Sequence, residues 1–103
     1  MTSHLVQVFL PLSCQGGSPQ PRAAFAAVRK ELLGRRGGVT IYARAPAEGL
    51  WQDDEGVDVD RIVIFEAMDD NFDPEWWTQY RTTLQSRFHQ EEILVRAIAT
   101  VRL

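Results

Sequence analysis

Four segments of the chain have residue patterns typical of β-strands: three alternate with a period of two, and the third along the chain, Arg61 to Met68, is nearly continuously apolar, as expected of a central strand. In the first segment Val6, Val8 and Leu10 share one face, and the residues between them share the other. In the last segment we expect the odd-numbered residues, from Ile93 to Val101, to point inward. The sequence therefore predicts four strands, at residues 4–12, 39–45, 61–68 and 93–101.

Two further segments repeat their apolar residues at helical spacing. Phe25, Val28 and Leu32 form a stripe that follows a loop rich in glycine and proline, and Gly37-Gly38 supplies the positive φ that ends many helices. A helix is therefore predicted between Pro21 and this glycine pair.

The second helix carries the clearest start signal in the chain. Asp73 suits the N-cap, Pro74 suits the first helical position, and Glu75 suits the positive end of the helix dipole. One helical face then collects large apolar residues, and we expect it to pack against a sheet. These residues are Trp77, Tyr80, Leu84 and Phe88.

The predicted order is β-α-β-β-α-β in a single domain covering residues 1–103. Right-handed crossovers carry both helices over the same side of the sheet, so the fold class is α+β: a ferredoxin-like βαββαβ sandwich with a four-stranded antiparallel sheet ordered 4-1-3-2. The other side of the sheet would be bare and too apolar for open water, which favours a homodimer. The residues expected there are Gln7, Phe9, Tyr42, Arg44, Val63, Phe65, Leu94, Arg96 and Ile98.

In its element order and half-apolar sheet face the chain resembles the dimeric α+β-barrel proteins, whose small ferredoxin-like subunits pair through their sheets. The stretch Arg-Ala-Pro-Ala-Glu-Gly-Leu-Trp, Arg44 to Trp51, is also similar to one in uncharacterised small bacterial proteins. This resemblance implies a fold shared by cofactor-independent monooxygenases, lactone isomerases, haem-degrading enzymes and ligand-sensing regulator domains. Fold alone does not choose among these functions.

Composition excludes several classes of protein. The chain has 103 residues, of which 45% are apolar and 24% charged, as in an ordinary globular domain. Its net charge of -3 offers no basic field for nucleic acid. The apolar run from Leu5 to Leu12 is too short to cross a bilayer, so we expect a soluble, cytoplasmic protein without a membrane partner. Cys14 is the only cysteine and is expected to be an ordinary loop thiol. No metal site and no cofactor are expected.

The connection from Pro46 to Asp60 is predicted to be a long loop. It carries six acidic residues and no basic one, which is typical of a solvated segment. Binding of a metal is the alternative, although Asp53-Asp54-Glu55 lacks the alternate-position ligands of a calcium loop. Trp51 must pack somewhere, and it either holds this loop or the partner subunit in place or forms a wall of a ligand cavity.

The candidate site residues lie on the face predicted to be bare. An arginine among apolar side chains needs a carboxylate partner, such as Glu48 or Glu66, or an anionic ligand. His4 is a candidate base at the start of the first strand, whereas His89 is interpreted as a partner of the helix dipole. The catalytic candidates are Arg44, Tyr42, Arg96 and His4, and the predicted ligand-binding residues are Phe9, Tyr42, Arg44, Trp51 and Arg96.

Two functions follow from these residues. The first is a homodimer that binds a small organic ligand, anionic if the arginines contact it, as a cofactor-independent monooxygenase or isomerase would. The alternative is a non-enzymatic dimeric assembly or regulatory module without a small-molecule site, in which the bare face is only an interface.

Overall fold

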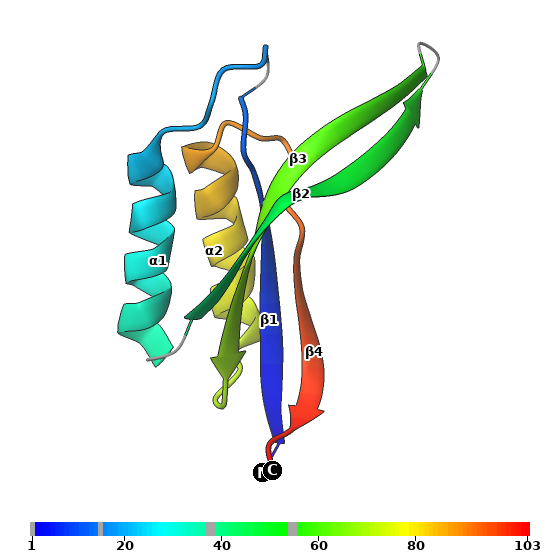
Figure 1. Ribbon diagram of the computed structural model, residues 1–103. Coiled ribbons are helices and arrows are strands. Elements are labelled where there is room, and N and C mark those ends of the chain that lie inside the picture. Colours follow the sequence, from blue (N-terminus) through cyan, green and yellow to red (C-terminus); the bar gives the residue numbers. More distant parts are fainter. Residues whose placement is uncertain (1, 15, 37–38, 54–55) are drawn as a thin grey trace.

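The chain folds into four strands and two helices in the predicted order (Figure 1). The computed structural model describes the backbone of residues 2–14, 16–36, 39–53 and 56–103, and the side chains of 3–14, 16–34 and 62–103. The elements are β1 (Thr2–Pro11), α1 (Arg22–Arg36), β2 (Val39–Asp53), β3 (Gly56–Asp69), α2 (Pro74–Arg87) and β4 (Val95–Val101).

The strands form one antiparallel sheet in the order β2-β3-β1-β4, which is the predicted order. Both helices lie on the same side of this sheet and leave its other side without a helical layer (Figure 1). The structure is therefore an α+β fold of two layers. No helix in the described part of the chain is long and apolar enough to cross a membrane.

The core lies between the helices and the sheet, and the helical stripes predicted from the sequence fill it. Val28 and Leu32 of α1 are buried, and so are Trp77, Tyr80 and Leu84 of α2. Because each stripe follows the helical repeat, one face of each helix is removed from water along its length. The sheet contributes Val6, Val8, Leu10, Val63, Phe65 and Ala67, and the segments beside it contribute Phe88 and Ile93.

Both ends of α2 have defined caps. The Oδ1 atom of Asp73 accepts hydrogen bonds from the backbone N–H groups of Glu75 and Trp76, at 3.1 and 3.4 Å, as the sequence predicted for an N-cap. At the other end the Gln90 N–H bonds to the Gln85 carbonyl and the His89 N–H to the Ser86 carbonyl. This pair of bonds defines a Schellman motif, and it places His89 at a φ of 53°.

The prediction of a long loop at residues 46–60 was wrong. Strand β2 continues to Asp53 and β3 begins at Gly56, with register shifts between Tyr42 and Ala47. The two strands form a hairpin that extends beyond the rest of the sheet (Figure 1). The reason is visible in Val57-Asp58-Val59-Asp60, which alternates with the strand period although its polar residues are all acidic.

The placement of Val63 and Phe65 on the bare face was also wrong. These residues pair with Leu10 and Val8 of β1, and both lie in the core beneath the helices. The run from Ile62 to Phe65 is apolar at every position, so its pattern does not show which residues face the helices. A shift of one residue exchanges the two faces of a strand, and here it brings Ile62 and Ile64 to the bare side.

The inward face predicted for the last strand is only partly covered. Ile93 is buried and precedes β4, which begins at Val95, but Ala97 and Ala99 are exposed and Val101 is 71% exposed. β4 is an edge strand, and the helical layer does not cover these positions. Tertiary packing thus leaves apolar residues of β4 open to solvent where alternation alone predicted burial.

Candidate functional site

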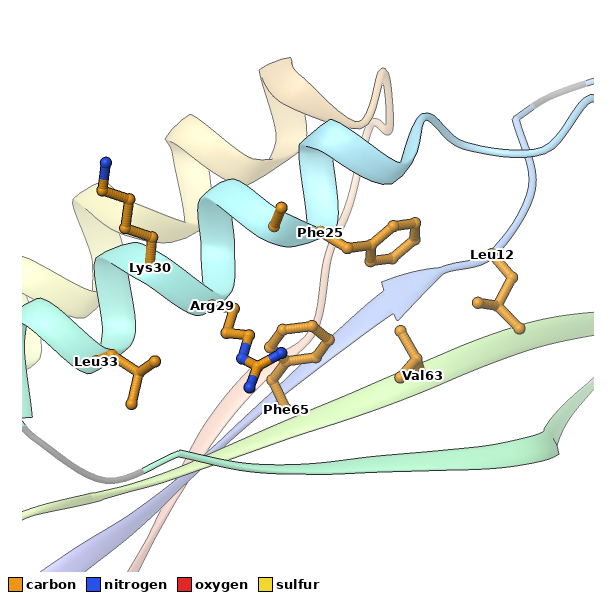
Figure 2. A pocket seen from close by; sticks show the side chains of 8 residues that line it. Leu12, Phe25, Arg29, Lys30, Leu33, Val63 and Phe65 are labelled. Carbon is orange, nitrogen blue, oxygen red and sulfur yellow. The ribbon is translucent and has the colours of Figure 1, made fainter.

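A groove lies between α1 and β3 (Figure 2). Its volume is about 560 Å³, within the range of about 300–1,000 Å³ that is usual for small-molecule sites. Apolar side chains form most of its surface, and two cationic residues complete it. The lining consists of Leu12, Phe25, Ala26, Arg29, Lys30, Leu33, Val63 and Phe65.

Aromatic rings form the inner wall of this groove. Phe25 of α1 lies 6.5 Å from Phe65 of β3 between ring centroids, at an interplanar angle of 26°. Phe25 also meets the edge of Phe88 at 5.2 Å, so contacts on two sides hold its ring. Leu33, about two helical turns further along α1 than Phe25, is 42% exposed. The groove is therefore bounded by packed aromatic rings at one end and open to solvent along α1.

The two cations of the groove point in different directions. Arg29 extends from α1 towards the sheet, whereas the Lys30 side chain extends outward from the helix (Figure 2). Among the side chains that are described, neither cation is in an ion pair, and the neighbouring Glu31 is bound by Arg87 at 2.7 Å. Arg29 is consequently the guanidinium best placed to meet an anionic group in the groove.

The predicted site on the bare sheet face is built around Arg96 and Phe9. The Arg96 Cζ atom lies 5.1 Å from the centroid of the Phe9 ring, which is within range of a cation–π contact. Its Nε atom donates to Gln7 Oε1 at 2.6 Å, and Gln7 Nε2 donates to Glu66 Oε2 at 2.5 Å. Gln7 thus links Arg96 to Glu66, one of the two carboxylates proposed as its partners.

Several predicted site residues belong to β2, whose side chains lie outside the described residues. The backbone of Tyr42 pairs with Ile64, and the backbone of Trp51 pairs with Asp58. The roles expected for Tyr42, Arg44, Glu48 and Trp51 therefore remain predictions.

His4 is separated from Phe9 and Arg96. It lies parallel to Phe72, with 4.3 Å between ring centroids and an interplanar angle of 18°. In β1 it has the same parity as Val6 and Val8, whose side chains are in the core, whereas Phe9 has the opposite parity. The structure thus does not bring His4 together with the residues it was expected to assist.

The sequence did not point to the groove residues, because Arg29 and Lys30 belong to no motif that distinguishes them from the other charged residues of the first helix. A signal was present: Phe25, Arg29 and Leu33 follow each other at intervals of four, beside the buried stripe. That spacing predicts a second face of α1, but it does not reveal a space between this face and β3.

The described residues contain no group of three or more His, Cys, Asp or Glu side chains arranged to hold a metal ion. Cys14 is half-buried in the loop after β1, and its sulfur lies 4.0 Å from the Pro19 carbonyl oxygen.

Comparison with known proteins shows a likeness of fold. No protein-family model matches the chain, and no curated protein matches it. Among solved structures, it is similar to a phage SAM lyase in complex with S-methyl-5'-thioadenosine, with a TM-score of 0.62 and 12% sequence identity. The similarity covers 93% of this chain and 80% of the lyase chain. At this identity the two proteins share an arrangement of strands and helices, and function does not follow from it.

Proposed function

We propose that this protein binds a small amphipathic anion, an apolar body with a carboxylate or sulfonate group, in the groove between α1 and β3. The observation that carries this proposal is an apolar groove of about 560 Å³ into which Arg29 extends (Figure 2). An apolar body gains roughly 25 cal/mol for each Å² it removes from water. The guanidinium group supplies a planar pair of donors that matches a carboxylate or sulfonate.

Burial and charge make different contributions to this binding. The aromatic wall formed by Phe25 and Phe65 is apolar and accepts many shapes, so it favours ligands by size and hydrophobicity. Arg29 favours anionic over neutral ligands, because a neutral ligand of the same size leaves the guanidinium without a new partner. An anion is therefore expected to bind more tightly than its neutral analogue.

We further propose that the chain is a ferredoxin-like subunit of a homodimer, as in dimeric α+β barrels. Support comes from the sheet face without helices, where Leu94 and Ile98 are 53% and 45% exposed. A second copy packed on this face would remove these side chains from water. The groove lies on the opposite, helical side of the sheet, so binding of a ligand there and pairing of subunits are separable properties.

Binding of laurate, with dodecanol as its neutral match, tests the proposed ligand class. Displacement of the fluorescent probe 8-anilinonaphthalene-1-sulfonate measures both, and calorimetry gives the dissociation constants. We expect laurate to bind more tightly than dodecanol. The Arg29→Glu substitution should weaken the binding of laurate about tenfold or more, which corresponds to about 1.4 kcal/mol of binding free energy. The effect of Lys30→Glu should be smaller because Lys30 extends away from the groove.

Arg22→Glu is the matched control, since it makes the same change of charge at the exposed first residue of α1 outside the groove. S-methyl-5'-thioadenosine, the compound bound by the phage SAM lyase, serves as a neutral aromatic competitor. If laurate and dodecanol bound with equal affinity, or if Arg22→Glu weakened the binding of laurate as much as Arg29→Glu did, the proposed role of Arg29 would be wrong. Absence of binding by every probe would overturn the proposed site.

A further inference from the structure

A polar row crosses the middle of the sheet face that has no helices. Glu66 on β3, Gln7 on β1 and Arg96 on β4 are direct partners in the register of the sheet. Gln7 donates to Glu66 and accepts from Arg96, as described above. Within the described side chains, the two terminal nitrogens of Arg96 and the Oε1 atom of Glu66 make no hydrogen bond or ion pair. The row thus has an acidic end and a basic end, and among the described side chains both ends have atoms that can make further hydrogen bonds.

Apolar rows flank this polar row on both sides. Towards one end of the strands, Phe9 pairs with Ile64, and its N–H bonds to the Leu94 carbonyl. Towards the other end, Leu5 pairs with Met68 on β3 and with Ile98 on β4. Among the described side chains, the polar row therefore lies between two apolar rows.

We infer that a second copy of this chain covers this face, related by a two-fold axis that runs along β1 past Gln7. This inference rests on the homodimer proposed above and adds its geometry. The axis exchanges the β3 and β4 sides of the sheet, so each copy's Arg96 meets the partner's Glu66. Two reciprocal ion pairs form. Each apolar row packs against the same row of the second copy, with Phe9 on the partner's Phe9.

Repulsion between like charges excludes the other simple way of stacking the two sheets. A two-fold axis running across the strands would place Glu66 on the partner's Glu66 and Arg96 on the partner's Arg96. Like charges brought together at an interface cost several kcal/mol. The axis along β1 satisfies the free ends of the row, and it keeps the strands of the two sheets nearly aligned, as in common sheet-on-sheet packing.

Charge reversal tests the arrangement, with the dimer dissociation constant measured by analytical ultracentrifugation. Arg96→Glu should place four carboxylates at the interface, and Glu66→Arg should place four guanidinium groups there. Each variant should raise the dissociation constant about tenfold or more, because each replaces two ion pairs by two like-charge contacts. The double variant E66R/R96E recreates both pairs with exchanged partners, and it should dimerise close to the unsubstituted protein.

The exposed residues Arg22 and Glu91 provide matched controls for the charge changes. Arg22→Glu and Glu91→Arg should leave the dissociation constant unchanged, and circular dichroism should show that every variant is folded. A dimer that tolerates both single reversals would overturn the axis along β1 but leave the homodimer standing. A monomer at all concentrations would overturn the homodimer and this inference together, while binding of laurate in the groove would be unaffected.

Discussion

The indole Nε1 atom of Trp77 donates a hydrogen bond of 2.8 Å to the Oδ2 atom of Asp69 in the protein interior. Asp69 is fully buried at the end of β3, and its Oδ1 atom accepts a bond of 3.1 Å from the Asn71 N–H. A buried carboxylate is tolerated only when such donors surround it. This bond therefore ties α2 to the end of the central strand β3.

Replacing Trp77 by Phe should cost about 1–3 kcal/mol of unfolding free energy, because it removes a donor from a buried carboxylate while an aromatic ring remains. Urea denaturation measures this cost. Adding Asp69→Asn should recover part of it, since an amide that lacks one partner is less costly to bury than a carboxylate. A Trp77→Phe protein within about 0.5 kcal/mol of the unsubstituted one would contradict the role given to this bond.

A second polar contact joins the two helices and should make stability depend on pH. The Tyr80 hydroxyl donates to Glu31 at 2.9 Å, and Arg87 binds the same carboxylate through two nitrogens at 2.7 and 2.8 Å. The hydrogen bond from Arg87 lowers the pKa of Glu31 below its ordinary value of 4.5. Burial, and then the bond to Glu31, raise the pKa of Tyr80 above its ordinary value of 10.0.

These pKa shifts determine how the unfolding free energy changes with pH. Since the pKa of Glu31 is lower in the folded state, its contribution is present above pH 4.5 and is lost as the pH falls through the lowered pKa. Since the pKa of Tyr80 is raised, its contribution is present below pH 10.0 and is lost as the pH rises. Glu31→Gln should flatten the acid side of a plot of unfolding free energy against pH, and Tyr80→Phe should flatten the alkaline side.

Near neutral pH the cost of Glu31→Gln should be only about 0.5 kcal/mol, because the ion pair is partly exposed and water screens it. Unfolding in urea at a series of pH values measures both effects. An acid side with the same slope in Glu31→Gln and in the unsubstituted protein would contradict the assignment.

His89 offers a stabilising substitution. Its φ of 53° lies in the left-handed region, where a side chain meets its own backbone and glycine does not. His89→Gly should therefore raise the unfolding free energy by about 0.5–1 kcal/mol, with the Schellman bonds of Ser86 and Gln85 retained. His89→Ala is the control, since alanine retains the Cβ atom. Thermal unfolding should show a higher midpoint for the glycine variant alone; equal midpoints would indicate that the helix end relaxes.

Much of the candidate site was beyond prediction because its parts come from different elements. Phe9 and Arg96 were expected on one face, and they do meet there, because strand alternation and register bring them together. The groove beside Arg29 has no such local signature. Its volume depends on the separation between α1 and β3, which the packing of Phe25 on Phe65 and Phe88 sets.

The sequence by itself determined the order of elements, the buried stripes of both helices and the start of α2 at Asp73-Pro74, because each depends on residues within a few turns of one another. Tertiary structure decided whatever depends on a distant partner. It chose which alternate residues of Ile62–Phe65 face the helices, through pairing with β1, and it left Ala97, Ala99 and Val101 exposed on an edge strand. An apolar run is the same in either phase, and only the neighbouring layer distinguishes inside from outside.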